Sequence, residues 1–81
     1  MQLEILTPSK NIFSGEVKLV KVPGSKGSFE ILNNHAAIIS TLISGELKVE
    51  MESGEISRYQ MSSGTVEVKN NHIVVLAESI T

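Results

Sequence analysis

The feature that most constrains the fold of this chain is a two-residue alternation of apolar and charged side chains. Leu47–Glu52 reads Leu-Lys-Val-Glu-Met-Glu, and Val66–Lys69 reads Val-Glu-Val-Lys. Successive side chains of an extended strand point to opposite faces of a sheet, so this period places one face in a core and the other in water. Ile and Val, which favour strands, also outnumber Leu and Ala. The chain is therefore predicted to be all-β, with Ala36–Ile43 as the one ambiguous stretch.

Turn residues divide this pattern into short strands. The tripeptide Ser-Gly-Glu occurs at Ser14–Glu16, Ser44–Glu46 and Ser53–Glu55, each time before a strand-like run where Gly can supply the positive φ of a turn. Asn33–His35 and Asn70–His72 mark two more turns, because Asn tolerates the same conformation. The predicted strands are Leu3–Leu6, Val17–Val22, Ser28–Leu32, Ala37–Leu42, Glu46–Met51, Ile56–Met61, Thr65–Val68 and Ile73–Glu78. This spacing predicts one domain spanning residues 1–81, an antiparallel sandwich or barrel.

Two runs depart from simple alternation. In Val17–Val22 the pattern slips by one between Leu19 and Val20, which predicts a β-bulge and a bend at that point. Ile73–Ala77 is apolar on both sides, with Val74 and Leu76 opposite Ile73 and Val75. A thin sandwich cannot bury both faces of such strands, so part of this surface is expected to contact a partner.

The composition excludes several classes of function. With no Cys there is no disulfide and no thiolate metal site, and with no Asp there is no Asp-containing triad or Asp-ligated Mg²⁺ or Ca²⁺ site. A net charge of −2 with dispersed cations argues against nucleic acid and leaves only a local basic patch. The longest apolar runs are far short of the ~20 residues that span a bilayer. The start Met1–Glu4 lacks the basic segment of a signal peptide, so a cytosolic location is expected.

The residues that could carry chemistry are few. His35 and His72 are the only imidazoles, and a metal site would need a third ligand from a Glu. Both are more simply interpreted as turn residues that bond local backbone. The loop Pro23–Gly27 lacks the spacing of a phosphate-binding loop. Three readings therefore stay open: an interaction module, a carrier domain modified at Lys26 in a hairpin, and a small enzyme that uses His35 and Glu30.

Several motifs follow one another in a distinctive order. They are Phe13–Val17 (Phe-Ser-Gly-Glu-Val), Val20–Gly27 (Val-Lys-Val-Pro-Gly-Ser-Lys-Gly), Ile31–Ala36 (Ile-Leu-Asn-Asn-His-Ala), Thr41-Leu42 with Gly45–Leu47, Ser63–Val68 and Ile73–Glu78. In this order they resemble the N-terminal domain of the epsilon subunit of F-type ATP synthase. The resemblance covers nearly the whole chain without large gaps, and its most specific block runs from Val20 to Ala36.

The sequence also departs from the family pattern. Ser28 stands where the family usually has Glu, Glu30 where it has Gly, and Asn33 and Ala37 where it has Pro. Glu30 could restore a carboxylate near the loop. The family's helical C-terminal hairpin, which in many members restrains ATP hydrolysis and in some binds ATP, has no counterpart up to Thr81. Neither property of that hairpin is therefore expected here.

The resemblance implies a flattened two-sheet β-sandwich of about 8–10 short strands. It implies a non-catalytic central-stalk subunit without a cofactor or metal, which links the gamma subunit to the c-ring and works in complex with the alpha and beta subunits. It would couple ion translocation to ATP synthesis at the cytoplasmic face of the plasma membrane, which it would reach only through the complex. The implied c-ring contacts are Gly24, Ser25, Lys26, Gly27, Ser28 and Glu30, and the implied gamma contacts are Thr7, His35, Ile38 and Leu42.

Overall fold

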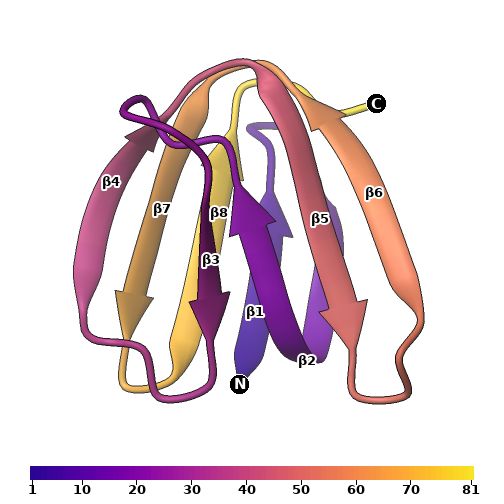
Figure 1. The fold of residues 1–81 in the computed structure, drawn as a ribbon. Helices are drawn as coiled ribbons and strands as arrows, with labels where there is room; N and C mark the ends of the chain where they lie inside the picture. Colours follow the sequence, from indigo (N-terminus) through magenta and orange to yellow (C-terminus); the bar gives the residue numbers. More distant parts are fainter.

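One long strand, β2, takes part in both sheets of this protein. The computed structural model describes residues 1–81. It contains eight strands: β1 (Gln2–Leu6), β2 (Asn11–Val22), β3 (Phe29–Leu32), β4 (Ile38–Leu42), β5 (Gly45–Met51), β6 (Ile56–Met61), β7 (Gly64–Lys69) and β8 (His72–Ala77). The strands curl around a common interior (Figure 1). The prediction of an all-β chain is confirmed.

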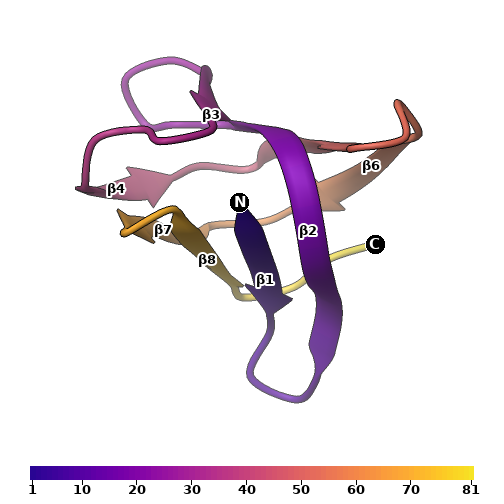
Figure 2. The ribbon, with the colours of Figure 1, turned by 90° about the horizontal axis from the view of Figure 1, so that it is seen from below.

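The strands form two facing layers, which we call sheet A and sheet B. The first half of β2 pairs with β1, and sheet A continues through β8 and β7 to β4. The second half of β2 pairs with β3 on one side and with β5 on the other, and β6 follows β5 in sheet B. Figure 2 shows the two layers edge-on, with β2 bending from one to the other. The expected two-sheet sandwich is thus present as one curled sheet folded over itself.

The bend in β2 coincides with an irregularity in its pairing. Val17 lies opposite Met51 and Leu19 opposite Glu50, so Lys18 is an extra residue in the ladder. The β-bulge predicted in this segment exists, but its predicted place between Leu19 and Val20 is wrong. Because Lys18 is the added residue, Val17 and Val20 both face the interior and are fully buried.

Two further expectations about strands and turns need correction. The pairing is not purely antiparallel, because β1 and β8 run parallel, with Gln2 opposite His72. Ser14–Glu16 is not a turn but lies inside β2, where Gly15 pairs with Leu3. Gly54 is the one Gly of the three Ser-Gly-Glu motifs that has a positive φ, of 95°.

The Asn-rich turns behave as predicted. Asn70 and Asn71 have φ of 52° and 61° and form a two-residue link between the paired ends of β7 and β8, which is the geometry of a type I′ hairpin. Asn34 has φ of 64° in the turn between β3 and β4. The side chain of Asn71 connects the two turns, because its amide nitrogen donates to Asn33 Oδ1 at 2.8 Å and its oxygen accepts from Asn34 N at 2.7 Å.

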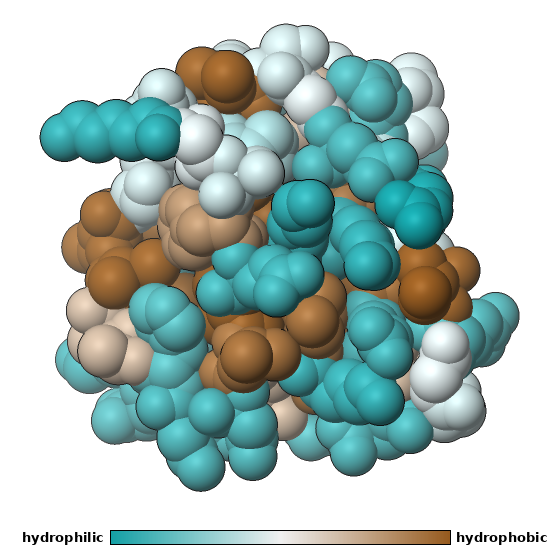
Figure 3. All heavy atoms as spheres, in the orientation of Figure 1, coloured by the Kyte–Doolittle hydropathy of each residue, from teal (hydrophilic) through white to brown (hydrophobic).

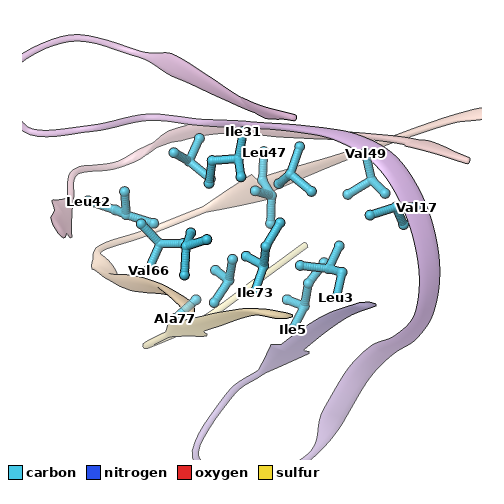
Figure 4. Packing of buried hydrophobic residues seen from close by; sticks show 14 of the residues in the cluster. Leu3, Ile5, Val17, Ile31, Leu42, Leu47, Val49, Val66, Ile73 and Ala77 are labelled. Atoms are coloured by element: carbon cyan, nitrogen blue, oxygen red, sulfur yellow. The ribbon is translucent and has the colours of Figure 1, made fainter. Parts of the chain in front are cut away.

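The core lies between the two sheets and is wholly apolar. Sixteen buried hydrophobic residues form one cluster, and no polar or charged residue is buried. Ile31, Leu47 and Val49 of sheet B point toward Ile5 and Ile73 of sheet A in Figure 4. Such a core needs no internal hydrogen bonds, so polar side chains remain available only at the surface.

Backbone bridges connect the two sheets at one end of the sandwich, which we call the closed end. It is the upper end in Figure 1. On one side Gly24 bridges to Leu42, with Ser25 N donating to Thr41 O at 3.1 Å and Ile43 N to Pro23 O at 2.9 Å. On the other side the segment after β8 bridges to β6 between Ile80 and Met61. These two bridges connect the sheets on opposite sides of this end, and the first of them lies at the loop between β2 and β3.

Candidate interaction surfaces

The structure brings together no cluster of groups that resembles a catalytic or metal site. No three His or Glu side chains lie close enough to share a metal ion. His35 Nδ1 lies 2.7 Å from Ala36 O, and His72 Nε2 lies 2.8 Å from Glu4 Oε2. Glu30 is placed on β3 opposite Lys21 and makes no hydrogen bond to His35. The structure contains no helix that could cross a membrane.

The loop Gly24–Ser28 is an exposed hairpin turn between β2 and β3. Ser25, Lys26, Gly27 and Ser28 are all exposed, whereas Gly24 is buried. The loop is anchored at its base, because Ser25 Oγ lies 2.8 Å from Thr41 Oγ1 and Gly27 N donates to Gly24 O at 3.0 Å. Gly27 has φ of 121°, a conformation that other residues rarely adopt. The anchored base holds the loop backbone, with the exposed Lys26, at the closed end of the molecule.

An apolar groove lies beside this loop on the outer face of sheet A, at the closed end. It has a volume of about 570 Å³, and the ends of β1, β4 and β8 and the start of β7 form its walls. Leu76 is half exposed on its floor. Ile73 and Val75 of the same strand are fully buried, as expected for a strand that is apolar on both faces. The full lining is Leu6, Thr7, Pro8, Thr41, Leu42, Ser63, Gly64, Thr65, Leu76, Ala77 and Glu78.

The four residues that the resemblance implies as gamma contacts occupy different environments. Thr7 lies at the rim of the groove. Leu42 also lines it but is only 3% exposed, and Ile38 packs against the core. His35 lies in the turn between β3 and β4, at the opposite end of β4. The structure therefore brings Thr7 and Leu42 together and leaves His35 apart.

The outward-facing residues of β4 are the ones that the sequence did not single out. Ile39 is 77% exposed and Thr41 is also exposed, on the outer side of sheet A. Alternation along Ile38–Leu42 places Ile39 and Thr41 on one face of the strand and Ile38, Ser40 and Leu42 on the other. The sequence does not show which of the two faces is buried, because Ile38 and Ile39 are adjacent and equally apolar.

The outer face of sheet B is different in character. Lys21, Lys48 and Arg58 lie in one row across β2, β5 and β6. Arg58 Nη1 pairs with Glu46 at 2.8 Å. Figure 3 shows hydrophilic residues in teal mixed with hydrophobic residues in brown over these strands. The face is a charged, solvated surface with scattered apolar residues, of which Leu32 is 51% exposed.

Comparisons with known proteins show which family and fold the chain matches. The family model described as "ATP synthase, Delta/Epsilon chain, beta-sandwich domain" matches residues 1–81. The chain is 41% identical over 78 residues to the ATP synthase epsilon chain of Desulforamulus reducens, and covers 58% of its length. It is 34% identical over 79 residues to the epsilon chain of Chlorobaculum tepidum, and covers 90% of that relative. These alignments take in 96% and 98% of the present chain.

Two solved structures have the same fold. One is a chain in the mitochondrial ATP synthase of Euglena gracilis, described as OSCP/F1/c-ring, with a TM-score of 0.92 at 22% identity. That match covers 98% of this chain and 51% of the other. The second is a chain in the central stalk/c-ring of the Tetrahymena thermophila mitochondrial ATP synthase, with a TM-score of 0.85 at 19% identity, covering 100% of this chain and 65% of the other.

Proposed function

Because this chain belongs to the family of β-sandwich domains of ATP synthase delta/epsilon chains, we propose that it works as an epsilon-type central-stalk subunit. In this role it links the gamma subunit to the c-ring, in complex with the alpha and beta subunits, and couples ion translocation to ATP synthesis. It is peripheral, at the cytoplasmic face of the membrane, and it is non-catalytic. The observation that carries the proposal is the pair of unlike surfaces, an apolar groove and a polar loop, side by side at the closed end.

The apolar groove is the proposed gamma-facing surface. Its exposed apolar residue is Leu76, with Thr7 at the rim and Thr41 toward the loop. An apolar surface with a polar rim is the usual form of a stable protein interface. Leu42 lines this groove and is almost fully buried, whereas Ile38 lies at the other end of β4 and packs against the core.

The gamma-facing groove is tested by a charge placed in it. Leu76→Glu should weaken binding to the gamma subunit at least about tenfold, because a carboxylate would be buried without a partner. The matched control is Leu32→Glu, since Leu32 is 51% exposed on sheet B and Leu76 is 50% exposed on sheet A. Pull-down of gamma by tagged chain measures both. Equal losses in the two variants would contradict the assignment of the groove.

The exposed loop is the proposed c-ring contact. Ser25, Lys26, Gly27 and Ser28 present polar atoms beyond the closed end, while buried Gly24 supports the turn. Glu30 lies further along, on the outer face of sheet B. Lys26→Glu should reduce ATP-driven ion pumping by the assembled complex, while Lys48→Glu, on the outer face of sheet B between Lys21 and Arg58, should not. Normal pumping by the Lys26 variant would remove the loop from the c-ring contact.

A carrier domain modified at Lys26 is the second candidate. The observation in its favour is that Lys26 is exposed in the tight hairpin turn between β2 and β3. Modification would add a lipoyl or biotinyl group to the lysine. Intact mass of the chain purified from its native host decides this, because an unmodified mass excludes the carrier role.

A further inference from the structure

Thr41 belongs both to the apolar groove and to the base of the loop between β2 and β3. Its exposed side chain lines the groove. Its carbonyl oxygen accepts from Ser25 N at 3.1 Å, and its hydroxyl oxygen lies 2.8 Å from Ser25 Oγ. Ser25 is the first exposed residue of the loop. Thr41 is the only groove residue whose side chain bonds to the loop, so it connects the two surfaces directly.

The contact between the loop and β4 has a buried part and an exposed part. Gly24 is buried and bridges to Leu42. It is tightly packed, because a Cβ at this position would lie 2.6 Å from Gly27 O. The bonds of Ser25 to Thr41 lie one residue further out, and both of these residues are exposed. The loop can therefore open at Ser25 while its base stays closed at Gly24.

The strength of the exposed hydroxyl bond depends on whether the groove is filled. In water such a bond contributes little net free energy, because water replaces it when it breaks. An apolar group in the groove would remove water from the Thr41 hydroxyl. Breaking the bond to Ser25 would then leave that hydroxyl without a partner, which costs more than an exchange with water. Filling the groove should therefore make it harder to open the loop.

We propose that occupation of the apolar groove holds the loop closed against β4 through the Ser25–Thr41 hydroxyl bond. Coupling between two sites is reciprocal, so a contact that keeps the loop closed also favours occupation of the groove. This coupling is a property of the chain itself and needs no particular occupant. Its meaning as a link between a gamma-facing and a c-ring-facing surface rests on the proposed function.

The coupling can be tested on the isolated chain with a covalently attached occupant. The chain has no Cys, so Thr65→Cys provides a single thiol that N-phenylmaleimide can label. Thr65 lines the groove and lies directly opposite Thr41. Lys69→Cys with the same label is the matched control, because Lys69 is exposed on the same face of β7 but outside the groove. We expect the label at Thr65→Cys, but not at Lys69→Cys, to slow amide hydrogen exchange of Ser25 about tenfold.

Removal of either hydroxyl shows whether the bond carries the effect. In the labelled Thr65→Cys chain, Thr41→Val or Ser25→Ala should abolish the slower exchange, and the Ser25 backbone amide still reports loop opening in both. Thr7→Val should preserve it, because the Thr7 hydroxyl also belongs to the groove but bonds to Lys10 O. Unchanged exchange after labelling, or slowing that survives both hydroxyl deletions, would overturn the coupling. Neither result depends on gamma, so a failed gamma pull-down would contradict the proposed function alone.

Discussion

At the scale of single residues, two neighbouring asparagines in one hairpin have different structural roles. Asn70 and Asn71 both adopt a positive φ in the same hairpin, yet only Asn71 bonds across to the neighbouring turn, through Asn33 and Asn34. The sequence predicted the turn conformation because Asn tolerates it. It could not predict the cross-turn bonds, because these depend on β3 and β8 lying in facing sheets.

Replacing each Asn by Gly separates the two tasks. Gly adopts a positive φ readily, so Asn70→Gly should change the free energy of unfolding by less than about 0.5 kcal/mol. Asn71→Gly keeps the same backbone but loses two side-chain hydrogen bonds, and should destabilise by about 1 kcal/mol. Urea denaturation followed by circular dichroism measures both. If the two variants are equally stable, the cross-turn bonds contribute nothing.

At the scale of elements, alternation predicts which side of a strand is buried but not which strand lies next to it. The expected bounds of β5 and β6 agree closely with the structure, because the apolar residues of β5 alternate cleanly and Gly-containing turns border both strands. The first half of β2 was missed, because Ser14–Glu16 has the composition of a turn and becomes extended only by pairing with β1. The parallel pairing of β1 with β8 leaves no mark on the sequence, since either direction uses the same two-residue period.

The bulge at Lys18 lies where β2 bends from one sheet to the other. Deleting Lys18 would leave Val17 and Val20 two residues apart in a regular ladder, so both could still face the core, but it would remove the bulge that accompanies the bend of β2 and should lower the midpoint of thermal unfolding. Lys18→Ala is the control, because it keeps the bulge and removes only the partly exposed Lys18–Glu50 ion pair at 3.2 Å, which contributes about 0–1 kcal/mol. Thermal unfolding distinguishes them. A cooperative transition near that of the unmodified chain in the deletion variant would show that the bulge is dispensable.

At the scale of the whole molecule, backbone bridges close one end of the sandwich, whereas side-chain hydrogen bonds of Asn71 connect two turns at the other end. The closed end carries both proposed contact surfaces, so the bridges that close it also fix the positions of Ser25 and Thr41. The family resemblance indicated the loop, and the structure supplies its anchoring. The sequence did not predict that Ile39 is exposed and Leu42 is buried. The adjacent Ile38 and Ile39 do not show which alternate residues of β4 face the core.

The bridge between β6 and the segment after β8 should make amide hydrogen exchange uneven along β6. Gln60 N donates to Thr81 O at 3.1 Å, whereas the outward amide of Arg58, two residues earlier, has no such partner. The Gln60 amide should therefore exchange at least about tenfold more slowly than that of Arg58. Residue-resolved hydrogen exchange by NMR measures the two rates. Similar rates would mean that the bridge from Ile80 to Met61 opens freely.

The parallel pairing of β1 with β8 has a consequence for the order of events during synthesis. Gln2 meets His72 and Leu6 meets Leu76, so these contacts span nearly the whole sequence. Contacts of such long separation cost much chain entropy and slow the search for the native state. On the ribosome, β1 can pair with β2 early, but its other side stays unpaired until residue 77 has left the exit tunnel. The strand made first therefore acquires its last neighbour only after nearly all of this domain has been translated.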